Sequence, residues 1–159
     1  MLKLRKMSEQ EFDAFAIESK NRYINDKIKA NGFTLEEAER VAEADFSRIL
    51  PDGFQSIDNF LFTLINKDSH DVGYLWYCIR GASDNKKAFI ADIMVREKFR
   101  GKGYGRKAMT LLESDVRSRG LKSIGLHVFG FNNVATKLYL SMGYQVTDLV
   151  MEKSLAPVN

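Results

Sequence analysis

The chain has 159 residues, 45% of them hydrophobic, and a formal net charge of +3. This length and composition suit one domain with its own core, and the modest charge gives no general affinity for nucleic acid. The lone Cys78 excludes a disulfide framework and a paired-cysteine zinc or redox motif. The N-terminal residues lack the apolar region of a signal peptide, and no apolar run could span a bilayer. We therefore expect one soluble, cytoplasmic domain over residues 1–159, with neither a membrane nor a nucleic-acid partner.

The first third of the chain predicts a strand followed by two helices. Residues 2–5 alternate in polarity, and the S-x-x-E pattern at Ser8 is a capping box that opens a helix. That helix should end at the Asn-Gly pair 31–32, since glycine suits a left-handed C-terminal cap. A second capping box at Thr34 opens another helix, which should stop before Pro51.

Three strand-like runs follow the helices. They cover residues 59–66, 72–80 and 88–95, and each is rich in β-branched and aromatic side chains. Polar turns of a few residues separate them, as in hairpin connections of the longer kind. The pattern therefore predicts an antiparallel meander.

The rest of the chain alternates helices and strands. A glycine-rich turn leads to a predicted helix over residues 104–119, a strand over 123–129, and a second helix over 132–142. Closing strands are expected after Gly143. The fold class predicted is therefore α/β of the α+β type, with a mixed, mostly antiparallel central sheet flanked by helices on both faces.

The turn before residue 104 concentrates positive charge and glycine. Residues 96–107 carry six cations and one anion, namely Arg96, Lys98, Arg100, Lys102, Arg106 and Lys107 against Glu97. A glycine turn from strand to helix presents unpaired backbone N–H groups and the positive end of the helix dipole to an anion. This turn lacks both the P-loop pattern and the third glycine of a dinucleotide fingerprint. The sequence thus predicts a phosphate site of another kind.

Two stretches of the chain carry short motifs that lie about 30 residues apart. Residues 100–105 read RGKGYG and follow an apolar strand, and residues 132–139 read NNVATKLY and are followed by a Gly-Tyr pair. These stretches resemble the two signatures of the GNAT superfamily of N-acetyltransferases, [QR]-x-x-G-x-[GA] and N-x-x-A-x-x-L-Y with a later G-[FY]. The resemblance implies a small, bacterial-type member with a single GNAT domain. In it, residues 1–58 would shape the substrate site and residues 59–154 would form the acetyl-CoA-binding core.

The resemblance also implies where acetyl-CoA binds as the acetyl donor. The residues it assigns to this site are Ile93, Met94, Val95, Arg100, Gly101, Lys102, Gly103, Tyr104, Gly105, Arg106, Asn132 and Tyr139. A backbone N–H of Met94 or Val95 would stabilise the negative charge that develops on the thioester carbonyl. No metal ion is expected, because neither His70 nor His127 has a second ligand at metal spacing.

The acceptor amine must lose a proton, since an ammonium of pKa 10.4 is only about one part in 10³ neutral at pH 7. Many GNAT enzymes use a glutamate on the strand before the glycine turn, where this sequence has Asp92. Asp92 is therefore the candidate base, with water-holding and structural roles left open and Glu43, Asp45 and Glu97 as alternatives. Tyr139, by resemblance, would protonate the leaving thiolate, with a core tyrosine as the alternative.

The predicted activity is direct transfer of an acetyl group from acetyl-CoA to a primary amine, with no acyl-enzyme. The acceptor stays open between a small-molecule amine and an amine of a protein or peptide, because the fold and cofactor site serve all of these. The alternative is a non-catalytic acyl-CoA-binding or sensor module, since the expected strand glutamate is missing. Dimers are common among such enzymes, so a homodimer is a further expectation.

Overall fold

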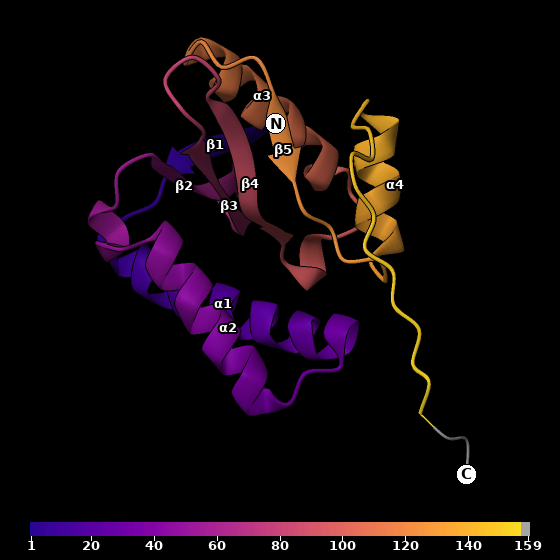
Figure 1. Cartoon of the computed structure of the whole chain (residues 1–159). Coiled ribbons are helices and arrows are strands. Elements are labelled where there is room, and N and C mark those ends of the chain that lie inside the picture. The colour runs from indigo at the N-terminus through magenta and orange to yellow at the C-terminus, as the bar shows by residue number, and fades with distance from the viewer. Residues whose placement is uncertain (157–159) are drawn as a thin grey trace.

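The structure is a computed structural model that describes residues 1–156, and a five-stranded sheet lies at its centre (Figure 1). The strands are β1 (Leu2–Lys6), β2 (Asn59–Asn66), β3 (Asp71–Arg80), β4 (Lys87–Val95) and β5 (Ile124–Leu126), in that spatial order. Neighbours from β1 to β4 are antiparallel, whereas β4 and β5 run parallel. The predicted mixed, mostly antiparallel sheet is confirmed.

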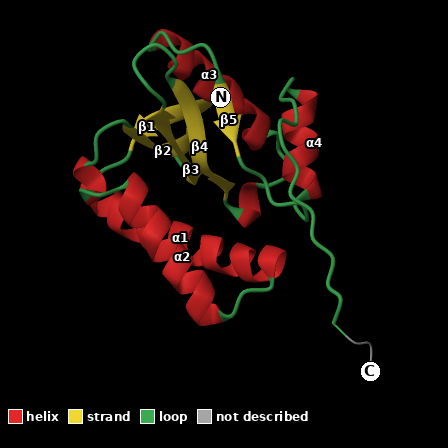
Figure 2. Ribbon diagram, viewed as in Figure 1, coloured by secondary structure: helices red, strands yellow, loops and turns green. Residues whose placement is uncertain are grey.

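Helices cover both faces of this sheet (Figure 2). On one face lie α1 (Glu9–Asn31) and α2 (Leu35–Ile49), which pack against each other. On the other face lie α3 (Tyr104–Ser118) and, beside the β5 edge, α4 (Asn133–Ser141). The predicted placement of helices on both faces is therefore also confirmed.

The two N-terminal helices begin where their capping boxes predict. The side chains of Ser8 and Thr34 accept hydrogen bonds from the N–H groups of Glu11 and Glu37, whose carboxylates bond back to the cap N–H groups. Gly32 ends α1 in the left-handed conformation, with φ 66°. Each box satisfies N–H groups that a helix start leaves without intrahelical partners.

Successive residues of β3 point to opposite sides of the sheet and enter two different cores. Tyr77 packs on the α3 side with Met109 and Leu112. Trp76 packs on the α1 side with Phe15, whose ring meets the indole edge-on at 5.8 Å. Because side chains on both faces of β3 are packed in a core, the centre of the sheet is a rigid support for the neighbouring strands.

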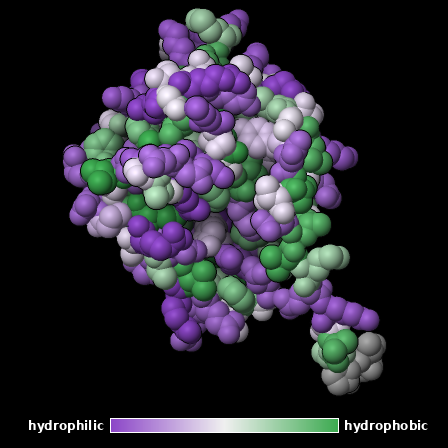
Figure 3. All heavy atoms as spheres, turned by 45° about the horizontal axis from the view of Figure 1, so that its top comes forward, coloured by the Kyte–Doolittle hydropathy of each residue, from purple (hydrophilic) through white to green (hydrophobic). Residues whose placement is uncertain are grey.

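Two predictions for the C-terminal third are wrong. The strand expected over residues 123–129 is only three residues long, because β4 offers β5 a pairing partner no further than Ile90. The strands expected after Gly143 are absent from the described residues, where 145–156 has no regular structure. The apolar side chains of this segment belong to no strand and remain exposed, namely Val146, Leu149, Val150, Met151 and Leu155. Figure 3 shows hydrophobic side chains on the right-hand side of this face of the molecule.

Candidate active site

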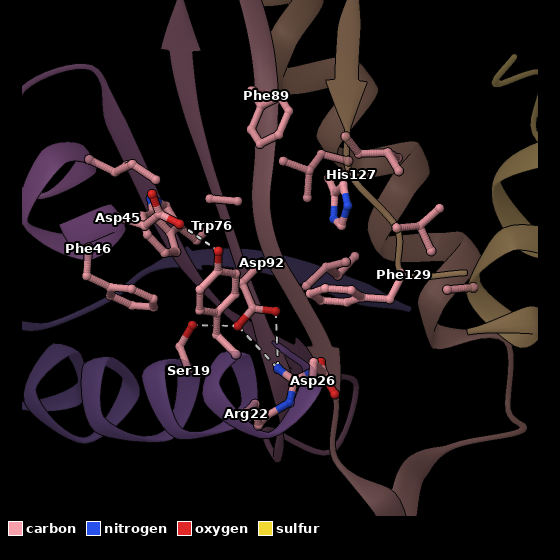
Figure 4. A pocket seen from close by; sticks show the side chains of 18 of the residues that line it. Ser19, Arg22, Asp26, Asp45, Phe46, Trp76, Phe89, Asp92, His127 and Phe129 are labelled. Carbon is pink, nitrogen blue, oxygen red and sulfur yellow. Dashed lines mark hydrogen bonds and ion pairs between the residues drawn. The ribbon is translucent and has the colours of Figure 1, made fainter. Parts of the chain in front are cut away.

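A cavity of about 320 Å³ lies where β4 and β5 separate (Figure 4). The parallel pairing joins residues 88–90 to residues 124–126 and then ends, so residues 91–95 of β4 have no partner from β5. Side chains of α1 and α2 line one side of the cavity, and those of residues 126–129 and α4 line another. The separation of two parallel strands thus creates an opening beside β4.

A β-bulge in β4 determines which side chains face this cavity. Trp76 of β3 opposes Asp92, but the next residue, Tyr77, opposes Ile90, which leaves Ala91 as the extra residue. Ala91 packs on the α1 side, and Asp92 also reaches α1, so two consecutive residues face the same way. Regular alternation would have pointed Asp92 into the apolar core under α3.

Asp92 is held by three side chains. Its carboxylate accepts hydrogen bonds from Ser19 Oγ at 2.6 Å and from the Arg22 guanidinium at 3.1 and 3.2 Å (Figure 4). The Tyr74 hydroxyl donates to the same carboxylate at 3.1 Å and lies 2.7 Å from the Arg22 guanidinium. Burial, with the charge of Asp92, raises the pKa of Tyr74, so the phenol keeps its proton. Asp92 is therefore part of a hydrogen-bonded ion pair.

The other candidate carboxylates lie in different surroundings. Asp45 of α2 lines the cavity and accepts hydrogen bonds from the Tyr23 hydroxyl at 2.6 Å and from Arg48 at 3.2 Å. Glu43 lies on the exposed side of α2, paired at 2.7 Å with a lysine of α1. Glu97 follows β4 in a short 3-10 turn (Glu97–Phe99). Neither glutamate lines the cavity.

Asp26 of α1 also lines the cavity, and the sequence analysis did not single it out (Figure 4). It lies one helical turn after Arg22, and no side chain of the described residues forms an ion pair with it. Burial raises the pKa of Asp26, and the charge of Arg22 partly counteracts this. A signal was present, because Ser19, Arg22 and Asp26 are spaced i, i+3 and i+7 and form a polar stripe on α1.

Helix α4 brings two predicted site residues to the same cavity. Asn132 lines it while its Oδ1 accepts a hydrogen bond at 3.2 Å from an N–H in the first turn of α4, so it is also the N-cap. Tyr139 lies about two turns further along the same face of the helix and also lines the cavity. Burial, and then the charge of Asp92, raises the pKa of Tyr139, so the phenol can donate a proton at neutral pH. From β4, Ile93 lines the cavity and Met94 is buried on the α1 side.

The glycine turn after β4 leaves its backbone open. Gly101 and Gly103 have φ angles of 72° and 79°, a region that disfavours residues with a Cβ. No heavy atom lies within 4 Å of the positions their Cβ atoms would take. Within the described chain, the N–H groups of residues 101–106 donate no backbone hydrogen bond, as expected at a helix start. The turn therefore presents a row of open N–H groups at the positive end of α3.

Side-chain contacts help to hold this turn in place. Arg100 Nε donates to the Val95 carbonyl at 2.9 Å, and Arg106 donates to a serine hydroxyl of α4 at 2.6 Å. Tyr104 packs edge-on against the Phe99 ring, and Lys102 Nζ lies 5.6 Å from the centre of that ring. A Cβ on the adjacent Gly105 would come within 3.3 Å of a leucine of α4. The turn residues thus form a second group, beyond the β4 end, distinct from those that line the cavity.

The two histidines lie apart from one another. His127 lines the cavity with its ring edge-on to Phe129 at 4.9 Å, and partial burial, together with the charge of Lys27, lowers its pKa. His70 lies before β3 and stacks on Phe99 at 6.1 Å. Residues 1–156 contain no cluster of three or more His, Cys, Asp or Glu side chains suited to a metal ion. In the same range, no helix has the length and apolarity needed to cross a membrane.

Comparison with known proteins agrees with this geometry. The family model described as "Acetyltransferase (GNAT) family" matches residues 29–144. The uncharacterized N-acetyltransferase YycN of Bacillus subtilis is 34% identical over 152 residues, which cover 96% of this chain and 97% of that protein. A crystal structure of the putative acetyltransferase YycN from Bacillus subtilis has a TM-score of 0.92 at 33% identity, over 99% of this chain and 100% of that one.

A more distant solved structure shares the fold. It is a predicted acetyltransferase with acetyl-CoA from Clostridium acetobutylicum, with a TM-score of 0.62 at 16% identity over 98% of this chain and 97% of that one. The family model covers well over half of the chain, and the YycN relative covers nearly all of it. The chain therefore belongs to the GNAT family of acetyltransferases, as its two signatures predicted.

Proposed function

We propose that this enzyme transfers the acetyl group of acetyl-CoA directly to a primary amine of a small molecule or a protein. The observation that supports the proposal is that β4 connects the cavity with the glycine turn. Its residues Asp92 and Ile93 line the cavity, and a few residues later the chain enters the turn with open N–H groups. An anionic donor held at the turn could extend along β4 and present its reactive end in the cavity.

The turn suits the phosphates of acetyl-CoA. A row of N–H groups at a helix start binds phosphate, and the space beside Gly101 and Gly103 lets the donor approach the backbone closely. When bound, acetyl-CoA supplies an activated acetyl group as a thioester. We assign its binding to Ile93, Met94, Val95, Arg100, Gly101, Lys102, Gly103, Tyr104, Gly105, Arg106, Asn132 and Tyr139.

The residues around the cavity divide the chemistry among them. A backbone N–H of Met94 or Val95, in the part of β4 without a β5 partner, stabilises the charge that develops on the carbonyl oxygen. Tyr139, with its raised pKa, donates a proton to the leaving sulfur. A carboxylate of the cavity takes a proton from the amine, which enters beside the aromatic side chains of α1, α2 and β3, namely Tyr23, Phe46 and Trp76.

Calorimetric titration with acetyl-CoA, CoA, NADH and ATP, followed by turnover with a panel of amines, tests this function. We expect selective binding of the two CoA species and acetylation of at least one amine. Gly103→Val should weaken CoA binding by at least about tenfold, because it places a Cβ in the turn and strains its backbone. Gly120→Val is the matched control, since Gly120 also has a positive φ of 77° but lies at the other end of α3.

Two outcomes would contradict the proposal, and a third would remove the support that the glycine variants give it. If neither CoA species binds, the glycine turn is not a donor site and the transferase function fails. If both bind but no amine is acetylated, the chain is an acyl-CoA-binding module rather than an enzyme with an amine acceptor. Loss of CoA binding in both glycine variants would mean that backbone strain, rather than the phosphate contact, explains the effect.

A further inference from the structure

Three carboxylates line the cavity, and they differ in how far their charge is already neutralised. Asp92 accepts hydrogen bonds from three side chains and forms an ion pair with Arg22. Asp45 accepts hydrogen bonds from a tyrosine and an arginine. Among the described residues, Asp26 is the cavity carboxylate for which no ion pair is formed.

A base must offer a lone pair and must gain a proton at little cost. Protonation of Asp92 would remove the negative partner of Arg22, and a partly buried guanidinium without its partner is destabilising. Protonation of Asp26 breaks no such pair. Asp26 also lies on the same face of α1 as Arg22, whose charge Asp92 already compensates (Figure 4).

Several charged or titratable groups face Asp26. Arg22 and Lys29 of α1 favour its ionised form, whereas Asp92 of β4 and burial favour its protonated form. Lys27 and His127 line the same cavity, but the Lys27 ammonium lies over two aromatic rings, 5.6 Å from the centre of Tyr23 and 5.9 Å from that of Phe129. None of these cations forms an ion pair with Asp26 within the described residues.

We propose that Asp26 is the catalytic residue that binds the ammonium group of the acceptor and takes its proton, whereas Asp92 is a positioning residue that holds Arg22. This inference rests on the proposed function as an amine acetyltransferase. Ser19 and Tyr74 complete the arrangement around Asp92, so the ion pair stays fixed while Asp26 exchanges protons. In this scheme Asp92 of β4 stays ionised and paired with Arg22, and Asp26 of α1 accepts the proton.

The protons balance in this scheme. One proton of the acceptor ammonium moves to an oxygen of Asp26, and the freed nitrogen lone pair attacks the thioester carbon. A C–N bond forms, the C–S bond breaks, and the sulfur takes a proton from Tyr139. The nitrogen loses a second proton as the amide forms, which restores the Tyr139 phenol directly or through water. The third proton stays on the amide, and the proton on Asp26 leaves to water.

The test compares Asp26→Asn with Asp13→Asn, an exposed aspartate on the same helix. We expect Asp26→Asn to lower kcat/KM for an alkylamine by about 10²-fold at pH 7, with acetyl-CoA affinity unchanged. Asp13→Asn should behave like the wild type. Asp26→Glu should recover part of the activity, because it restores a carboxylate on the same helix face.

Two further readouts separate proton transfer from a structural role. Amines whose conjugate acids have a pKa below 7 are already neutral, so the deficit of Asp26→Asn should shrink several-fold with them. It should also shrink as the pH rises, because more of the alkylamine is then neutral. A deficit of equal size for neutral and protonated amines at every pH, or full activity in Asp26→Asn, would overturn the inference. If the wild type acetylates no amine at all, the proposed function itself fails, which is a separate result.

Discussion

Helix α1 has an acidic side chain near each end, and the two differ in their surroundings and in their roles. At the start of α1, Glu11 accepts hydrogen bonds from Arg5, from the Ser8 N–H and from Thr63. In the last third of the helix, Asp26 lies in a cavity without an ion-pair partner among the described residues. The carboxylate at the start secures the helix to β1 and β2, and the later one is left available.

The pKa values of these two carboxyl groups move in opposite directions. The hydrogen bonds from Arg5, above all, lower the pKa of Glu11 to about 2. Burial raises the pKa of Asp26. A carboxylate that is stabilised when ionised contributes to folding, whereas one that is destabilised when ionised is suited to accept a proton. Between the two lies the Arg22–Asp92 pair, which links α1 to β4.

Breaking the Arg22–Asp92 pair should give the largest change in stability. Arg22→Met leaves the Asp92 carboxylate, 17% exposed, without its counter-ion, and we expect a loss of about 2–3 kcal/mol in the free energy of unfolding. This is below the full cost of a buried pair because Arg22 itself is 39% exposed. Urea denaturation at pH 7 measures the loss.

A second substitution sharpens this test. Adding Asp92→Asn to Arg22→Met should recover much of the lost stability, because a neutral amide costs less to leave without a cation than a carboxylate does. Arg40→Met on α2 is the control, since Arg40 is 72% exposed and only 4.0 Å from its partner, and should cost less than about 0.5 kcal/mol. Equal losses in Arg22→Met and Arg40→Met would show that the pair does not stabilise α1.

Removing the charge of Glu11 should have a smaller effect. Glu11→Gln weakens the capping box and the Arg5 ion pair, and we expect about 1 kcal/mol less stability at pH 7. The pKa of Glu11 is lowered in the folded state, so its contribution is present above pH 4.5 and is lost as the pH falls towards 2. The difference from the wild type should therefore shrink over that range in urea denaturation.

Glu9→Gln provides the matched control for this measurement. Glu9 lies in the same first turn of α1, so both substitutions remove one negative charge near the helix start. Glu9 takes no part in the capping box. A cost in Glu9→Gln as large as that in Glu11→Gln would mean that the helix dipole, and not the specific contacts of Glu11, stabilises this end.

Local patterns allowed most of the fold to be predicted from the sequence. Capping boxes at Ser8 and Thr34 gave both helix starts, since the relevant hydrogen bonds join residues three apart. The strand from residue 123 was predicted too long because its length depends on how far β4 stays beside it. The segment after Gly143 has apolar residues typical of a strand, but pairing needs a partner that sequence periodicity does not supply.

The glycine turn could be predicted from the sequence more fully than the cavity could. The turn is contiguous in the sequence, so its open N–H groups were predictable from RGKGYG alone. The cavity is lined by residues of β4, α1 and α4, which are far apart in the sequence. Its geometry also depends on a bulge at Ala91, and no sequence motif predicts that bulge. Asp92 was therefore found by its strand position, while its contacts with Ser19 and Arg22, some 70 residues earlier in the chain, were not.

Neutralising Asp26 should give the smallest stability change and one of opposite sign to that of Glu11. Because the pKa of Asp26 is raised in the folded state, ionisation of this group opposes folding, and its stabilising contribution is present at low pH and lost as the pH rises. Asp26→Asn should therefore be as stable as the wild type at low pH and slightly more stable at pH 7. Thermal unfolding at pH 3 and pH 7, with Asp13→Asn as the control, measures this. A protein that loses stability at pH 7 on Asp26→Asn would show that Asp26, like Glu11, supports the fold, and the contrast between the two ends of α1 would not hold.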